Sequence, residues 1–131
     1  MPQLFTREET DALLPHIAPL LTQARDLKRQ YDEAQAALTG VQGAVKSNGH
    51  SLDVELSRAT GGAGQAAAAI DALIERVNTF GVEVKDVEMG LCDFRSMLDG
   101  REVYLCWKLG EERVAYWHEL HTGYASRQPL D

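Results

Sequence analysis

The sequence predicts an α+β fold in which a long antiparallel helical hairpin, similar to a coiled coil, packs with a small C-terminal antiparallel β-sheet. Two segments, residues 7–38 and 51–80, place apolar side chains at alternating spacings of four and three. This is the heptad pattern of paired helices. Residues 39–50 contain glycines and a Ser-Asn-Gly turn signal, which is typical of a loop. From residue 81 onward strict alternation replaces the heptad period, and alternation indicates strands.

The first helix is expected to begin near residue 7. Thr6 and Glu9 have the spacing of a capping box, in which each side chain satisfies a backbone N–H at the helix start. Pro15 and Pro19 each remove one intrahelical hydrogen bond, at a cost of about 3 kcal/mol. We therefore expect this helix to bend or break there. Its seam consists of Leu13, Ile17, Leu20, Ala24, Leu27, Tyr31, Ala34 and Leu38.

The second helix has an equally regular seam and stops before Gly81, a residue that commonly ends helices. Gly61, Gly62 and Gly64 interrupt it where the seam residues are smallest. This turn either frays or serves as a close-contact surface, and the sequence leaves both open. The seam consists of Leu52, Leu56, Ala59, Ala63, Ala66, Ile70, Leu73, Val77 and Phe80.

Residues 81–131 form the small β unit of the same single domain. GVEVKD reads as a short strand, and a hairpin over residues 102–119 is the clearest pattern. In that hairpin Tyr104 and Cys106 share one face of their strand, and Tyr116 and His118 share one face of the returning strand. GLCDFRSML, residues 90–98, is either a further strand or an edge loop, and residues 120–131 are expected to be irregular.

Length and charge restrict the class of protein. A chain of 131 residues suits one compact domain. The net charge of −7 is spread over both halves, since residues 1–80 hold seven Lys/Arg against ten Asp/Glu and residues 81–131 hold six against ten. Neither half offers the basic stripe that phosphate neutralisation requires, so nucleic acid is not a favoured partner.

The sequence also favours a cytoplasmic protein. No apolar run approaches the roughly 18 residues of a membrane span, and the first residues lack a signal-peptide pattern. Cys92 and Cys106 form no CxxC pair, so we expect buried free thiols in a reducing compartment.

An antiparallel helix pair has one seam and leaves its flanks exposed. Such hairpins gain a third layer or a second copy of themselves, and a homodimer in the form of a four-helix bundle is the favoured expectation. The alternative is a monomer whose hairpin is covered by its own sheet.

Several motifs extend along the chain: FTREETDALLP, then GVEVKD and GLCDF, and finally DGREVYLCWKLGEERVAYWHELHTGYASRQPL. Through them the chain resembles an uncharacterised bacterial family catalogued as domain of unknown function 2203. The resemblance covers nearly the whole chain and implies a helical hairpin joined to a small sheet, but no activity. At His121 the family favours an acidic residue and at Ser126 a glycine, so the resemblance argues against His121 as an essential ligand.

The C-terminal segment carries the candidate ligand-binding residues. Arg101 and Arg127 have the guanidinium forks that hold a small anion or a peptide carboxylate, Trp117 and Tyr124 offer apolar walls, and His118 offers a donor. The same arginines have a structural alternative, in which they pair with Asp93, Asp99 or Glu119.

Two further hypotheses involve metal binding and thiol chemistry. His118 and His121 would bind a metal ion if Glu119, Asp93 or a cysteine completed the shell, although no HExxH or CxxC motif accompanies them and no cofactor is favoured. Cys92 or Cys106 would act as a nucleophile if His118 supplied the base.

The function expected from these patterns is a non-enzymatic interaction module. It self-associates through the helical hairpin and presents the C-terminal sheet to a protein or a small ligand. The alternative is a small enzyme or a metal- or anion-binding protein with a site at Asp93, Arg101, His118 and Arg127.

Overall fold

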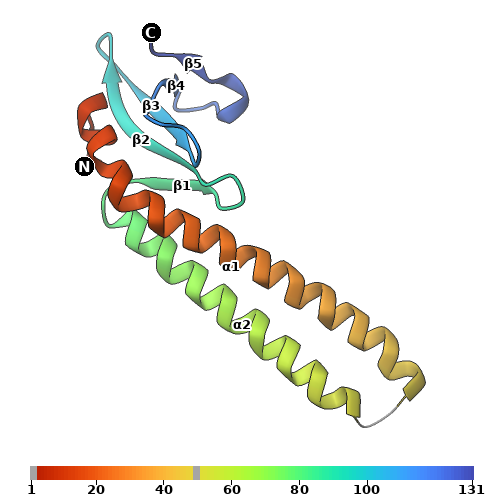
Figure 1. The fold of residues 1–131 in the computed structure, drawn as a ribbon. Coiled ribbons are helices and arrows are strands. Elements are labelled where there is room, and N and C mark those ends of the chain that lie inside the picture. Colours follow the sequence, from red (N-terminus) through yellow and green to blue (C-terminus); the bar gives the residue numbers. More distant parts are fainter. Residues whose placement is uncertain (1–2, 49–50) are drawn as a thin grey trace.

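The protein has two helices followed by a five-stranded antiparallel sheet, which is an α+β fold (Figure 1). The computed structural model describes residues 3–48 and 51–131, and the side chains of residues 3–37 and 64–131. The helices are α1 (Arg7–Asn48) and α2 (Ser51–Asn78). The strands are β1 (Glu83–Asp86), β2 (Leu91–Leu98), β3 (Arg101–Lys108), β4 (Tyr116–His118) and β5 (Gln128–Pro129).

Helix α1 begins as its capping box predicts. The Thr6 N–H donates to Oε1 of Glu9 at 2.8 Å, and the Glu9 N–H donates to Oγ1 of Thr6 at 3.1 Å. The helix contains Pro15 and Pro19 without a break, so of the two expected outcomes, a bend or a break, the break is wrong. Ile17 and Leu21 are among the most deeply buried side chains, and their burial offsets the hydrogen bonds that the prolines remove.

The expected loop at residues 39–50 is also wrong over most of its length, because α1 continues to Asn48 and α2 starts at Ser51. Gly40 and Gly43 lower helix stability by only about 1 kcal/mol each, and no proline lies in this segment. Residues 49 and 50, and the side chains around Gly61 and Gly62, lie outside the described residues. Helix α2 ends at Asn78, two residues before the expected end, and Gly81 follows with φ of +86°.

The sheet has the strand order β1-β2-β3-β4-β5, so every strand lies beside its neighbours in sequence. GLCDFRSML contributes β2, a full eight-residue strand that pairs with both β1 and β3. Asp99 (φ 51°) and Gly100 (φ 83°) join β2 to β3. A two-residue Asp-Gly connection with two positive φ angles is the favoured hairpin turn. Residues 120–131 are not wholly irregular, since they contain a 3₁₀ turn (Tyr124–Ser126) and β5.

The hairpin expected over residues 102–119 is present as β3 and β4, but its second strand has only three residues. The backbone of Val114 is held by α1 instead of by β3. Asp11 Oδ1 accepts from the Val114 N–H at 2.8 Å, and Arg7 Nε donates to the Val114 carbonyl at 3.0 Å. These bonds divert the chain before it joins the sheet at Tyr116.

One apolar cluster joins side chains of both helices to one face of the sheet. Ile17, Val77 and Phe94 belong to it, together with Leu105 and Trp107. Leu14 and Leu21 also belong to this cluster, although they lie off the heptad seam, so α1 has a wider apolar stripe than a two-helix seam needs.

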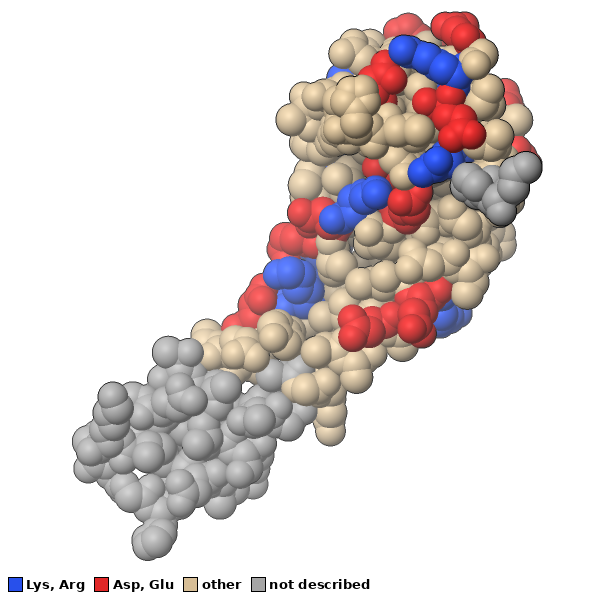
Figure 2. All heavy atoms as spheres, turned by 180° about the vertical axis from the view of Figure 1, so that it is seen from behind, with Lys and Arg blue, Asp and Glu red and all other residues tan. Residues whose placement is uncertain are grey.

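The surface seen in Figure 2 carries Lys and Arg interleaved with Asp and Glu rather than a continuous basic stripe. Within the described residues, no helix is both long and apolar enough to cross a membrane.

Candidate functional site

The candidate site lies on the sheet face opposite the apolar cluster. Cross-strand pairs point to the same face of a sheet. Asp93 pairs with Cys106, and Tyr104 pairs with His118, while the neighbouring residues Phe94 and Leu105 pair on the core face. The strand alternation therefore brings acidic, thiol, phenol and imidazole groups together on one side.

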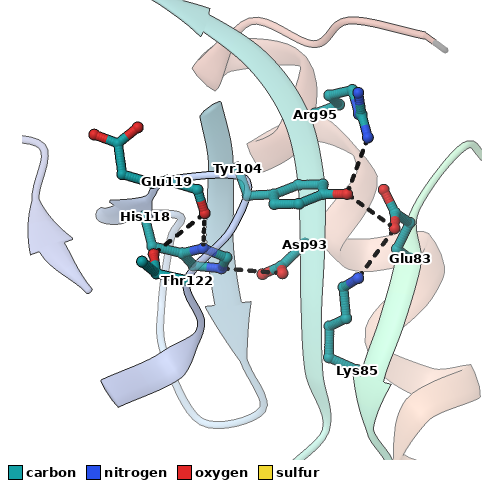
Figure 3. Close-up of polar contacts among 8 residues, drawn as sticks. All are labelled: Glu83, Lys85, Asp93, Arg95, Tyr104, His118, Glu119 and Thr122. Carbon is teal, nitrogen blue, oxygen red and sulfur yellow. Dashed lines mark hydrogen bonds and ion pairs between the residues drawn. The ribbon is translucent and has the colours of Figure 1, made fainter. Parts of the chain in front are cut away.

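Asp93 and His118 form the centre of this face, and both are almost fully buried, at 3% and 2% exposure. Nε2 of His118 lies 3.0 Å from Oδ2 of Asp93 (Figure 3). Nδ1 of His118 lies 2.8 Å from the Glu119 carbonyl oxygen. A carbonyl oxygen only accepts hydrogen bonds, so Nδ1 carries a proton, and Nε2 faces the carboxylate.

The Glu119 carbonyl is fixed by a turn that follows β4. The N–H and the hydroxyl of Thr122 each donate to it at 3.2 Å. The oxygen that orients the His118 ring is therefore itself held in place, and Figure 3 shows Thr122 and Glu119 beside the imidazole.

Cys106 adds a thiol to the pair. Asp93, Cys106 and His118 each offer one potential metal-ligand atom, and these three atoms lie within 4.8 Å of one another. Among the described residues, no other group of three or more His, Cys, Asp or Glu residues has this geometry. Burial, followed by the negative charge of Asp93, raises the pKa of the Cys106 thiol well above its usual range. A thiol in this state is a poor nucleophile, which weighs against the nucleophile hypothesis for Cys106.

Cys92 is also a free buried thiol, but it lies on the core face. Burial raises its pKa as well, with a further contribution from Asp93. Its strand partner is Trp107, so it is separated from His118 by the thickness of the sheet.

Tyr104 joins the buried pair to the surface. Its hydroxyl donates to Oε1 of Glu83 at 3.1 Å and accepts from Arg95 at 3.3 Å (Figure 3). Burial acts to raise the pKa of Glu83, but hydrogen bonds from Lys85 and Tyr104 outweigh it and lower that pKa. Glu83, Lys85 and Arg95 line a surface groove of about 430 Å³.

Arg127 is held by Glu111 rather than by any of its expected partners. Its Nη2 donates to both oxygens of Glu111 at 2.8 Å. Its guanidinium lies 4.0 Å above the Tyr116 ring and 5.0 Å above the Tyr124 ring. Burial acts to lower the pKa of Arg127, but the hydrogen bond to Glu111 and nearby negative groups raise it overall.

The expected ligand-binding residues separate into three pairs. Asp93 meets His118, and Tyr124 meets Arg127. Arg101 lies above Trp117, 5.4 Å from its ring, and pairs with Glu119 at 2.8 Å. The Arg101–Glu119 pair agrees with the structural alternative for Arg101.

His121 is exposed and is not part of the cluster that contains His118. The metal hypothesis that joined these two histidines is therefore not supported by the geometry, whereas Asp93 and a cysteine do lie beside His118. Sequence reasoning missed Glu111 and Tyr104 as neighbours of the site. The available signal was strand parity for Tyr104, which alternates in phase with Cys106.

No curated protein and no solved structure matches the chain. A family model does match it, over residues 3–130, and its description is Uncharacterized conserved protein (DUF2203). That range contains both helices and all five strands in full. The chain therefore belongs to the DUF2203 family of uncharacterized conserved proteins.

Proposed function

We propose that this protein is a non-enzymatic interaction module that self-associates through a coiled-coil-like helical hairpin and presents its sheet to a partner protein or small ligand. The observation that carries the proposal is the extent of α1 beyond the core. Ala24 is the last fully buried residue of α1 among those whose side chains are described, and the helix continues to Asn48. At about 1.5 Å per residue, this part of α1 extends roughly 36 Å.

Figure 1 supports an arm-like role for this region, because the two helices run side by side away from the sheet. Leu27 still packs against the core cluster, and Tyr31 and Ala34 continue the heptad seam beyond it; all three are only partly buried. An apolar stripe without a third layer gains free energy when a second helix pair covers it. A twofold dimer would supply that layer through the same residues of the second copy.

The base of the arm carries a groove suited to such a partner. Its volume is about 460 Å³, and its lining includes four apolar or aromatic residues, Tyr31, Ala67, Ile70 and Val87. The other lining residues are charged: Lys28, Asp32, Asp71 and Asp86. Protein interfaces likewise combine apolar surface with polar surroundings.

The second proposed candidate is a metal- or anion-binding protein with a site at Asp93, Arg101, His118 and Arg127. For an anion, the geometry gives little support, since Arg101 and Arg127 pair with different glutamates. For a metal ion, the buried cluster around His118 is a specific observation in favour, and it is developed below. A cytoplasmic location is part of the proposal and is supported by two free cysteines, which suit a reducing compartment.

Native mass spectrometry and light scattering over a range of protein concentrations test self-association. We expect a dimer for the unmodified chain and a shift to monomer for Ile70→Glu, which places a charge among the apolar residues that line the groove. Ala72→Glu is the matched control, because Ala72 lies on the same helix and is exposed. Circular dichroism establishes that both variants fold. A chain that stays monomeric at the highest concentrations, or an Ile70→Glu variant that dimerises as well as the control, would refute the proposal.

A further inference from the structure

We propose that Asp93, Cys106 and His118 form a binding site for one divalent transition-metal ion of the zinc class. The three residues come from three adjacent strands, β2, β3 and β4. Asp93 lies directly opposite Cys106, and His118 lies opposite Tyr104, two positions along β3. Ligands on paired strands are held more rigidly than ligands on loops.

The orientation of His118 favours metal binding. In metal sites the ligating histidine usually donates its other ring N–H to a carbonyl or carboxylate, which fixes the ring. Here Nδ1–H donates to the Glu119 carbonyl at 2.8 Å. Nε2 is thereby the nitrogen left to coordinate an ion, and it faces Asp93 at 3.0 Å.

Asp93 supplies an independent observation. Its Oδ1 is buried and accepts no hydrogen bond from an N–H or O–H group of the described residues, although its Oδ2 faces His118. Besides His118, the donor beside the carboxylate is the Cys106 thiol, whose hydrogen bond to Asp93 helps to raise the thiol pKa and which is a weak donor. A buried carboxylate oxygen without a donor is unfavourable by about 1–3 kcal/mol or more. A cation between the two side chains would satisfy the carboxylate without a further donor.

The charges of the cluster are compatible with a buried ion. The 3.0 Å hydrogen bond between Nε2 and Oδ2 needs one shared proton, because Nδ1 already donates its own proton to the Glu119 carbonyl. With a protonated Cys106 thiol, the metal-free cluster is therefore neutral. When a divalent ion binds, both protons leave to solvent, and the ion is coordinated by a carboxylate, a thiolate and a neutral imidazole. The net charge is again zero. The positive charge of the nearby Arg127 is compensated by Glu111, 2.8 Å away, so it adds little repulsion toward a bound cation.

The donor set selects the class of metal. A thiolate and an imidazole with one carboxylate suit Zn²⁺ or Co²⁺, whereas Mg²⁺ and Ca²⁺ prefer oxygen donors throughout. In a tetrahedral zinc site the ligand atoms are roughly 3.3–3.6 Å apart, as metal–ligand bonds of about 2.0–2.3 Å require. The ligand atoms lie within 4.8 Å of one another, and Nε2 and Oδ2 are 3.0 Å apart, so each distance reaches this range with a change of roughly 1.5 Å or less. Three protein ligands leave a fourth position for water or a ligand donor.

Titration of the metal-free protein with Co²⁺ tests the site directly. We expect one ion per chain, with the thiolate-to-cobalt charge-transfer absorption and the intense visible bands of tetrahedral cobalt. Cys106→Ser should lose the charge-transfer absorption, and Cys92→Ser should keep it. These variants form a matched pair, because both thiols are free and fully buried on adjacent paired strands but face opposite sides of the sheet.

X-ray absorption of the zinc-loaded unmodified protein keeps the proposal testable if Cys106→Ser fails to fold. We expect one sulfur ligand at about 2.3 Å with nitrogen and oxygen ligands nearer the metal. His121→Ala should bind zinc as the unmodified chain does. Zinc surrounded by nitrogen and oxygen alone, charge-transfer absorption that survives in Cys106→Ser, or no binding at equimolar Co²⁺ or Zn²⁺ would each overturn the proposal.

Discussion

Tyr104 and His118 face each other across β3 and β4, with ring centroids 5.5 Å apart and ring planes tilted by 49°. This contact places the phenol between a buried polar pair and a surface network. The tyrosine ring covers one side of the imidazole, while its hydroxyl reaches Glu83 and Arg95 (Figure 3). Tyr104 is thus both an apolar wall for His118 and a polar connection to β1 and β2.

Tyr104→Phe separates these two roles. It removes the hydroxyl bonds to Glu83 and Arg95 and keeps the ring, so we expect a loss of about 1 kcal/mol in the free energy of unfolding. Urea unfolding measures it. Tyr124→Phe is the control, because its hydroxyl bonds to Lys108 at an exposed position, and its loss should be within about 0.5 kcal/mol. Equal effects in the two variants would contradict a structural role for the Tyr104 hydroxyl.

His118→Ala is expected to destabilise the metal-free protein strongly. The change leaves the Asp93 carboxyl buried without its partner, and breaking a buried polar pair in this way costs about 3–5 kcal/mol. Thermal and urea unfolding in the presence of a chelator measure the effect. His121→Ala, at an exposed position, should change stability by less than about 0.5 kcal/mol. A mild effect of His118→Ala would mean that water solvates Asp93.

Arg101→Ala and Arg127→Ala compare two ion pairs of equal length in different surroundings. Both arginines lie 2.8 Å from a glutamate oxygen, but the Arg101 side chain is 56% exposed and the Arg127 side chain is 9% exposed. Exposed pairs contribute about 0–1 kcal/mol, whereas removing one partner of a mostly buried pair costs about 3 kcal/mol. Urea unfolding should therefore separate the variants clearly. Similar losses would show that burial does not set the strength of these pairs.

Gly90→Ala tests the turn between β1 and β2. Gly90 has φ of +61°, and a Cβ atom there would collide with the Leu109 side chain. We expect a loss of about 1–3 kcal/mol, from backbone strain and overpacking. Gly100→Ala is the control, since Gly100 also has a positive φ but no atom within 4 Å of the added Cβ. Thermal unfolding should show a smaller loss for Gly100→Ala, near 1 kcal/mol.

The sequence predicted those features that depend on local periodicity. The heptad pattern identified both helices, and alternation placed Tyr104 and Cys106 on one face of β3. Burial also agrees with the expectation that Val82 and Val84 share one face, since Val82 belongs to the core and Val84 packs against it. These signals lie within a few residues of one another, so no knowledge of the rest of the chain is needed.

Features that depend on distant contacts were harder to predict. Val114 leaves the alternating pattern because Arg7 and Asp11, more than 100 residues away in sequence, hold its backbone. The partner of Arg127 is Glu111 in the turn before β4, a choice that sequence spacing does not determine. The length of β2, in contrast, could have been predicted from local sequence alone. Asp99-Gly100 is a hairpin turn signal, and it would have identified the full strand before it.

The attachment of Val114 to α1 has a mechanical consequence. Arg7 and Asp11 belong to the first turns of the same helix that extends to Asn48, and they grip both the N–H and the carbonyl of one residue beside β4. Because these bonds and the far end of the hairpin belong to one continuous helix, a partner that tilts α1 would also strain the bonds to Val114. Hydrogen exchange of the Val114 amide, with and without such a partner, would measure this effect.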